Sequence, residues 1–316
     1  MLDRFRVGPL PGFPHVYTII FLHDKQGNGH NFARRLFTTR ADDTRNHGRS
    51  TNIQGLLEEF RFVFPTSPLR SESGNEFEME WFRENSNGQE GPYQPTLEQA
   101  IDAVLELIRD EERLVPRSQI FLGGFGQGFA LAVSALFADG RGDLAGVIGL
   151  NGWMPFYEEI GEGNPSQATL IDRCRTYFQP MRFSEDLAMV DAPTPTPPVT
   201  SCADSDASYQ NVSLPDPPST YGILQRIQTG DIVTPIFMSH TIDNDVVPHE
   251  VGYEAVLLIN DIGLPTHFEE YGEGTTHPRH GVNEYKAIND MCQWIRIQCR
   301  ARLFGNLFGE HTHNGS

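Results

Sequence analysis

Residues 118–137 read SQIFLGGFGQGFALAVSALF, and this stretch decides the fold. A short apolar run leads into the glycine turn Gly124-Phe125-Gly126-Gln127-Gly128, and an apolar helical segment follows. A strand, a tight glycine turn and a helix in this order are typical of a nucleophile elbow, which presents its central residue to a site. The outer glycines let the strand and the helix pack closely. The central residue is Gly126, which has no side chain.

Strands and helices alternate on both sides of this turn. Short apolar and β-branched runs predict strands at 16–23, 61–68, 144–153 and 234–240, with a late strand starting at 266. Helical periodicity predicts helices at 30–38, 97–112 and 284–303, the second of them capped by Thr96. This alternation indicates an α/β fold whose mostly parallel central sheet carries helices on both faces.

We expect one domain over residues 1–316. Residues 191–220 are rich in proline, serine, threonine and aspartate, which predicts a surface insertion. Residues 304–316 predict a mobile tail.

Composition narrows the class of function. The net charge is -18, from 42 acidic and 24 basic residues, so binding to nucleic acid or to anionic lipid is disfavoured. No window approaches the ~20 apolar residues of a membrane span, and no signal peptide is visible. The four cysteines form no C-x-x-C pair, which favours a reducing, cytoplasmic location. The pattern predicts no cofactor and no metal site.

Several segments resemble the acyl-protein thioesterase and carboxylesterase family of α/β-hydrolases, in the family's order along the chain. The glycine turn resembles LGGFSQGGALA, with glycine in place of the serine. The other segments are FLHDKQGNGHNFA (21–33), RFVFPTSP (61–68), WF (81–82), LNGWMPF (150–156), SHTIDNDVVP (239–248) and the region of His277 and His280. The resemblance implies an α/β-hydrolase fold and a small-molecule or acylated substrate bound as an ester or thioester.

The resemblance places the nucleophile at Gly126, where no hydroxyl exists to form an acyl-enzyme. Ser134 and Ser118 lie too far from the turn to replace it. The oxyanion hole of the family maps to the backbone N–H groups of Gln127 and Lys25, which survive side-chain changes. Asp24, beside Lys25, replaces a family glycine and sets a charge next to this hole.

The acid and base positions are also altered or ambiguous. The acid of the family falls on Asn244, and Asp243 or Asp245 is the alternative. For the base, spacing to the closing helix favours His280, whereas spacing from the preceding strand favours His277; we prefer His280. Departures at several positions favour natural divergence over one engineered substitution.

Three functions are therefore open. The chain is a weak or inactive ester or thioester hydrolase by descent, or a non-hydrolytic enzyme that uses a histidine base for proton abstraction, elimination or cyclisation. The third is a catalytically dead protein that binds an acylated ligand. The sequence does not identify the oligomeric state.

Overall fold

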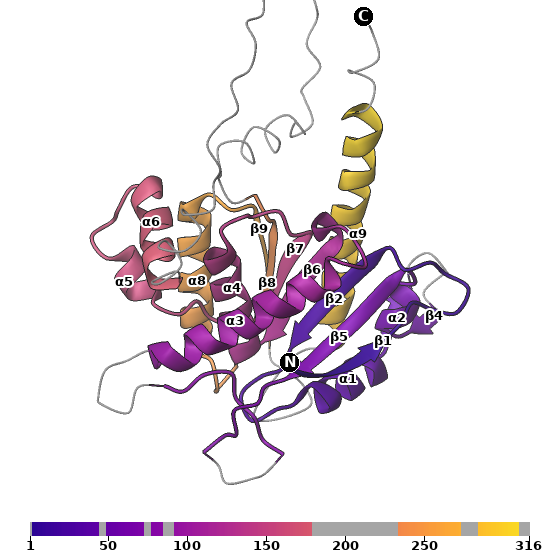
Figure 1. Ribbon diagram of the computed structural model, residues 1–316, viewed down its shortest axis with the longest axis horizontal. Coiled ribbons are helices and arrows are strands. Elements are labelled where there is room, and N and C mark those ends of the chain that lie inside the picture. Colours follow the sequence, from indigo (N-terminus) through magenta and orange to yellow (C-terminus); the bar gives the residue numbers. More distant parts are fainter. Residues whose placement is uncertain are drawn as a thin grey trace, which may run out of the picture.

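The computed structural model describes residues 2–43, 49–72, 77–84, 92–178, 233–272 and 284–309. Its centre is a seven-stranded sheet of order β1-β5-β2-β6-β7-β8-β9 (Figure 1). β1 runs antiparallel to β5, and every other neighbouring pair is parallel. The strands are β1 (Asp3–Val7), β2 (Tyr17–Leu22), β5 (Phe60–Thr66), β6 (Ile120–Phe125), β7 (Gly146–Leu150), β8 (Ile236–Thr241) and β9 (Thr266–Tyr271). A separate ribbon pairs β3 (Ala41–Asp43) with β4 (Arg49–Thr51).

Helices cover both faces of the sheet, as the sequence predicts. One face packs against α3 (Gln94–Glu111), α4 (Gln127–Asp139), α6 (Gln167–Phe178) and α8 (His249–Ile262). The other packs against α1 (Gly29–Thr38), α2 (Ile53–Leu56) and α9 (Glu284–Gly309). A short helix, α5 (Tyr157–Gly161), lies beside α6 and α8. The prediction of a mostly parallel α/β sheet is confirmed.

The central strands are apolar because both of their faces are covered. Every residue of β2, β6, β7 and β8 is buried. Strands of a parallel sheet that are buried on both sides carry continuous apolar runs instead of alternation. The run that follows Gly126 is apolar for the same reason, since α4 is buried along almost its whole length.

The strand order places two loops together. The chain passes from β2 to β5 on one side, and then returns to β6 on the other side of β2. In an open parallel sheet this reversal leaves a crevice at the carboxyl ends of the two strands, where ligands bind. The loop after β2 and the turn after β6 therefore meet at one site.

Some predictions of local structure are corrected. Thr96 is not the cap of α3, because the helix begins at Gln94 with Tyr93 as its N-cap and a proline in its first turn. Pro95 supplies a preset helical φ there, so Thr96 is the third residue of the helix and lies within its first turn. The Thr96 hydroxyl instead donates to the Tyr93 carbonyl and accepts from Arg83 N.

The structure also extends the closing helix to Gly309, so the predicted tail at 304–316 overlaps it, and residues 310–316 lie outside the described part. The predicted insertion at 191–220 lies outside the described residues as well. Within the residues that are described, no helix is both long and apolar enough to cross a bilayer.

Candidate active site

Gly126 lies on the tight turn between β6 and α4. Its φ is 52° and its ψ is -117°, a backbone conformation that side chains rarely adopt. Its neighbours are glycines for a different reason, which is close approach. A Cβ at Gly124 would lie 2.2 Å from the Gly128 carbonyl carbon, and one at Gly128 would lie 2.3 Å from Leu22 O. The turn thus has the strained geometry of a nucleophile elbow.

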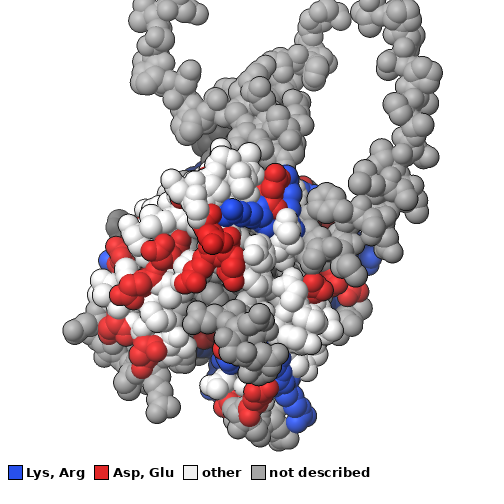
Figure 2. Space-filling view, turned by 90° about the vertical axis from the view of Figure 1, so that its left-hand side faces the viewer, with Lys and Arg blue, Asp and Glu red and all other residues white. Residues whose placement is uncertain are grey.

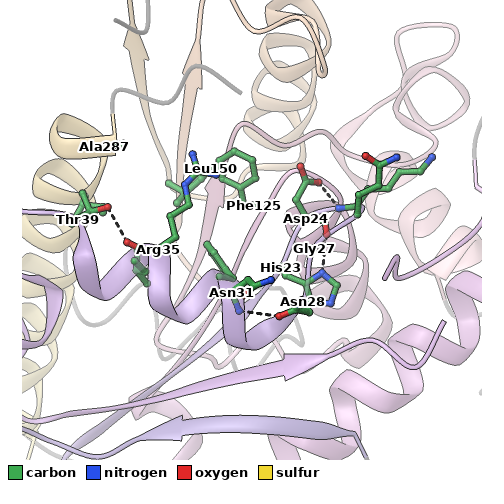
Figure 3. A pocket seen from close by; sticks show the side chains of 15 residues that line it. His23, Asp24, Gly27, Asn28, Asn31, Arg35, Thr39, Phe125, Leu150 and Ala287 are labelled. Atoms are coloured by element: carbon green, nitrogen blue, oxygen red, sulfur yellow. Dashed lines mark hydrogen bonds between the residues drawn. The ribbon is translucent and has the colours of Figure 1, made fainter. Parts of the chain in front are cut away.

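The Asp24 carboxylate fills the space in front of this turn. Asp24 Oδ1 accepts from Lys25 N at 2.7 Å (Figure 3). The same oxygen also accepts from Gln127 N at 2.8 Å. These are the two N–H groups that the resemblance assigns to the oxyanion hole. A Cβ at Gly126 would lie 2.1 Å from Asp24 Oδ1 and 2.5 Å from its Cγ. Asp24 in this position is therefore compatible with glycine at 126 and with no other residue.

His23 fixes the loop that carries Asp24. His23 Nε2 accepts from Ser67 N at 3.1 Å, so the proton lies on Nδ1, which donates to Asp24 O at 2.7 Å. Burial lowers the pKa of His23 to about 4, although the hydrogen bond to Asp24 opposes the shift. With both nitrogens bonded and the ring neutral, His23 positions the loop and is not available as a base.

Gln127 ties the turn to the segment around Trp81. Its Oε1 accepts from Trp81 N at 2.7 Å, and its Nε2 donates to Phe82 O at 2.9 Å. Trp81 in turn donates from its indole to His23 O at 2.8 Å. The WF segment (81–82) therefore holds both loops of the site in place, the one that carries Asp24 and the turn at Gly126.

Asn244 is a loop-capping residue in this structure. Its side-chain Oδ1 accepts from Val246 N at 2.9 Å and from Val247 N at 3.1 Å, and the residue is buried. An amide oxygen that accepts two backbone bonds stabilises the turn before α8. Asp243 and Asp245, the alternative acids, are exposed on either side of it. His280 and His277 lie outside the described residues, so the site's base stays a prediction.

Ser134 does not approach the turn. It is fully buried within α4, and its hydroxyl donates to Ala130 O at 2.7 Å. A serine that satisfies its hydroxyl on the preceding helical turn is a packing residue.

A pocket of about 230 Å³ opens beside Asp24. Phe32, Arg35 and Leu36 of α1 line the pocket, as do Phe125 and Leu150. Figure 3 shows Arg35, Phe125 and Leu150 around it. The Arg35 guanidinium carbon lies 5.8 Å from the centre of the Phe125 ring. The lining also includes Ala287 and Ile288 of α9, so α1 and α9 both contribute to the pocket. The pocket takes a small ligand, because drug-sized sites begin at roughly 300 Å³.

The sequence did not reveal the role of Asp24. Its only signal was an acidic residue at a position where the resembling family has glycine. The Asp24 side chain reaches back to Gln127 N, which is 103 positions away in the chain. Among the described residues no group of three or more histidines, cysteines or acids could hold a metal ion.

The fold is that of an α/β-hydrolase. It combines a mostly parallel sheet, a strained glycine turn after a central strand and a site at the switch point of the sheet. Solved structures share it. Acyl-protein thioesterase 2 of Zea mays has a TM-score of 0.54 at 16% identity, over 94% of this chain and 99% of its own. Esterase PE8 has a TM-score of 0.57 at 13% identity, over 93% and 98%. Residues 11–181 match the phospholipase/carboxylesterase family model, and the chain belongs to that family.

The curated relatives that the chain matches include acyl-protein thioesterases. Acyl-protein thioesterase 1 of Yarrowia lipolytica is 30% identical over 152 residues, which are 46% of this chain and 61% of that protein. A Dictyostelium discoideum protein, acyl-protein thioesterase 1 homolog 1, is 28% identical over 146 residues, or 45% and 59%. The chain thus matches about three fifths of the length of these relatives.

Proposed function

We propose that this chain binds a small ligand at the family's site without hydrolysing carboxylic esters or thioesters by a serine mechanism. The observation that carries the proposal is the Asp24 carboxylate, which occupies both oxyanion-hole donors beside a turn that has no hydroxyl. Our first hypothesis is an ester or thioester hydrolase by descent that is weak or inactive, and this observation disfavours any remaining serine-type hydrolysis.

The chemistry follows from what ester hydrolysis requires. An oxygen nucleophile must attack the acyl carbon, and two N–H donors must receive the negative oxygen that develops. Gly126 offers no such oxygen. The donors at Lys25 and Gln127 already bind a negative carboxylate, so a second oxyanion would meet a like charge at contact distance. Either change alone impairs the reaction, and the two together remove the nucleophile and the stabilised transition state.

The ligand is a small molecule with a large apolar part. Apolar atoms make up most of the pocket's surface, and the acyl-protein thioesterases among the relatives act, by their names, on acylated proteins. Nucleic acid is not a proposed partner. Figure 2 shows acidic side chains outnumbering basic ones on the face that carries α5, α6 and α8, which would repel a phosphate backbone. Few cysteines, three of them unpaired thiols among the described residues, support a reducing, cytoplasmic location.

The test is labelling with a serine-directed fluorophosphonate probe, together with hydrolysis of short p-nitrophenyl esters and acyl thioesters. We expect no adduct near residue 126 and no turnover above the uncatalysed rate in the unmodified chain. The Asp24→Gly/Gly126→Ser variant should gain the adduct, because it recovers the hydroxyl and frees both donors. Asp24→Gly alone is the matched control and should stay unlabelled. An adduct on the unmodified chain at any pocket serine, or ester turnover by it, would refute the proposal.

A further inference from the structure

Asp24 holds its carboxylate in the place where the family's reaction holds an ester. In serine-type hydrolysis the acyl group belongs to the substrate, and its oxygen enters the oxyanion hole while the enzyme supplies an alcohol. Here the oxygen in the hole is Asp24 Oδ1, and the acyl carbon attached to it is Asp24 Cγ. The acyl group of the site therefore belongs to the protein.

The Asp24 carboxylate fits in this position because residue 126 is glycine and has no side chain. The space that a side chain would fill lies 2.1 Å from Asp24 Oδ1 and 2.7 Å from Oδ2, so both oxygens stand where the family's serine would be. Asp24 also lines the pocket, together with Phe125. The carboxylate is thus at the reacting position of the site and in contact with the space that receives a ligand.

From this arrangement we propose that Asp24 is the nucleophile of the site, and that its substrates are small apolar alkyl electrophiles of the epoxide class. The roles are exchanged: the protein supplies the acyl group and the substrate supplies the alcohol. Aspartate carboxylates serve as nucleophiles in other enzymes that form covalent intermediates. This inference rests on the proposed absence of serine-type hydrolysis.

The first step forms an ester. A carboxylate oxygen of Asp24 attacks a ring carbon of the epoxide, a new C–O bond forms, and the ring C–O bond to that carbon breaks. The released alkoxide takes a proton from water and leaves hydroxide. The product is a 2-hydroxyalkyl ester of Asp24, with the whole mass of the epoxide added to the protein.

The second step uses the donors at Lys25 and Gln127. Water adds to Asp24 Cγ, and the negative charge that develops on Oδ1 is stabilised by the two N–H groups that already bind this atom. Collapse of the intermediate breaks the ester bond to the substrate's oxygen. Of the two protons of the added water, one goes to that oxygen and the other neutralises the hydroxide. A diol leaves and the carboxylate is restored, so one water is consumed for each epoxide.

The pocket supports this class of substrate. Its lining of Phe32, Leu36, Leu150 and Ile288 suits a short alkyl or phenyl group, which its volume of about 230 Å³ accommodates. The electrophile carries no charge, so desolvating it beside Asp24 costs little. The first N–H group of α4, Gln127 N, donates to Asp24, and the N-terminus of this helix favours negative charge there in both steps.

The experiment incubates the full chain with styrene oxide or 1,2-epoxyhexane in ¹⁸O-labelled water, followed by peptide mass spectrometry. We expect either the epoxide mass on Asp24 or, after turnover, one ¹⁸O in its carboxylate. Glu84 is an internal control, because this nearby carboxylate is 59% exposed yet lies outside the hole. Asp24→Asn, which keeps an oxygen for both donors, should show neither mass change at residue 24, whereas Glu84→Gln should react as the unmodified chain does.

Two outcomes overturn the proposal. One is an Asp24 that carries neither the epoxide nor ¹⁸O in a folded chain, and the other is labelling of Glu84 to the same extent as Asp24. The fold of Asp24→Asn is checked by circular dichroism and thermal unfolding. An absent adduct in a chain that also lacks esterase activity refutes the nucleophile alone, whereas fluorophosphonate labelling refutes the proposed function.

Discussion

Gly126→Ser in this chain should be destabilising by itself and largely tolerated once Asp24 is removed. The new Cβ would lie 2.1 Å from Asp24 Oδ1, so the carboxylate must leave its two donors. Hydrogen bonds to a charged group are worth roughly 1.5–3 kcal/mol, and we take about 2 kcal/mol for the net loss. A side chain at a φ of 52° adds backbone strain of about 1 kcal/mol. The free energy of unfolding should therefore fall by about 3 kcal/mol.

The double variant separates the steric conflict from these other costs. Asp24→Gly loses the same hydrogen bonds and should cost about 2 kcal/mol by itself. In Asp24→Gly/Gly126→Ser the hydrogen bonds are lost only once, so the double variant should also cost about 3 kcal/mol. Additive behaviour would give about 5 kcal/mol, and the expected coupling is about 2 kcal/mol in favour of the pair.

The assay is urea unfolding of the four proteins of the cycle, followed by circular dichroism at one pH. Independent sites add to within about 0.5 kcal/mol, so a coupling of about 2 kcal/mol is well resolved. Additivity of the two single changes would show that Asp24 and residue 126 do not share the same space. It would refute the geometry on which the proposed function depends.

Three further outcomes are expected. Burial lowers the pKa of His23 to about 4, so the unfolded chain binds a proton more readily than the folded chain does. The contribution of His23 to the free energy of unfolding is full above about pH 6.5 and should fall by roughly 3 kcal/mol as the pH drops to 4. In His23→Gln, the urea midpoint should depend less on pH over this range. Asn244→Asp should change the free energy of unfolding by less than about 1 kcal/mol, because aspartate also caps turns. Asn244→Ala leaves two loop N–H groups without their acceptor and should lower the free energy of unfolding by about 2 kcal/mol. Equal losses in the two variants would contradict the capping role. Gly128→Ala should lower the free energy of unfolding by about 3 kcal/mol or more, because its Cβ would clash with Leu22 O. Gly8→Ala is the control, since its Cβ would contact nothing, and it should be nearly neutral when both variants are compared by thermal unfolding.

The sequence predicted the framework because buried parallel strands and the glycine turn have local signatures. Continuous apolar runs marked β2, β6 and β8, and the turn at Gly126 lies where the pattern placed it. β1 was not predicted, because its sequence DRFRV has no apolar run. It forms a half-exposed edge strand that pairs with β5. Thr96 was misread because the helix begins at Gln94, three residues before the start at Leu97 that the capping pattern implies.

The site was less predictable because its chemistry depends on side-chain direction. The backbone donors at Lys25 and Gln127 were identified, but what they bind is decided by the rotamer of Asp24 and by the strand order that brings 24 and 127 together. Asn244 was read as an altered acid from its position, whereas its Oδ1 accepts from two loop N–H groups. Neither fact is local to the sequence.

The contact between Asp24 and Gly126 makes the tolerance of each position depend on the residue at the other. With a side chain at 126, Asp24 cannot keep its carboxylate in this position, because a Cβ there would lie 2.1 Å from Oδ1. A serine introduced at 126 alone therefore meets a steric conflict that a simultaneous change at 24 removes. Positions 24 and 126 thus form an epistatic pair, in which the effect of a substitution at one depends on the residue at the other.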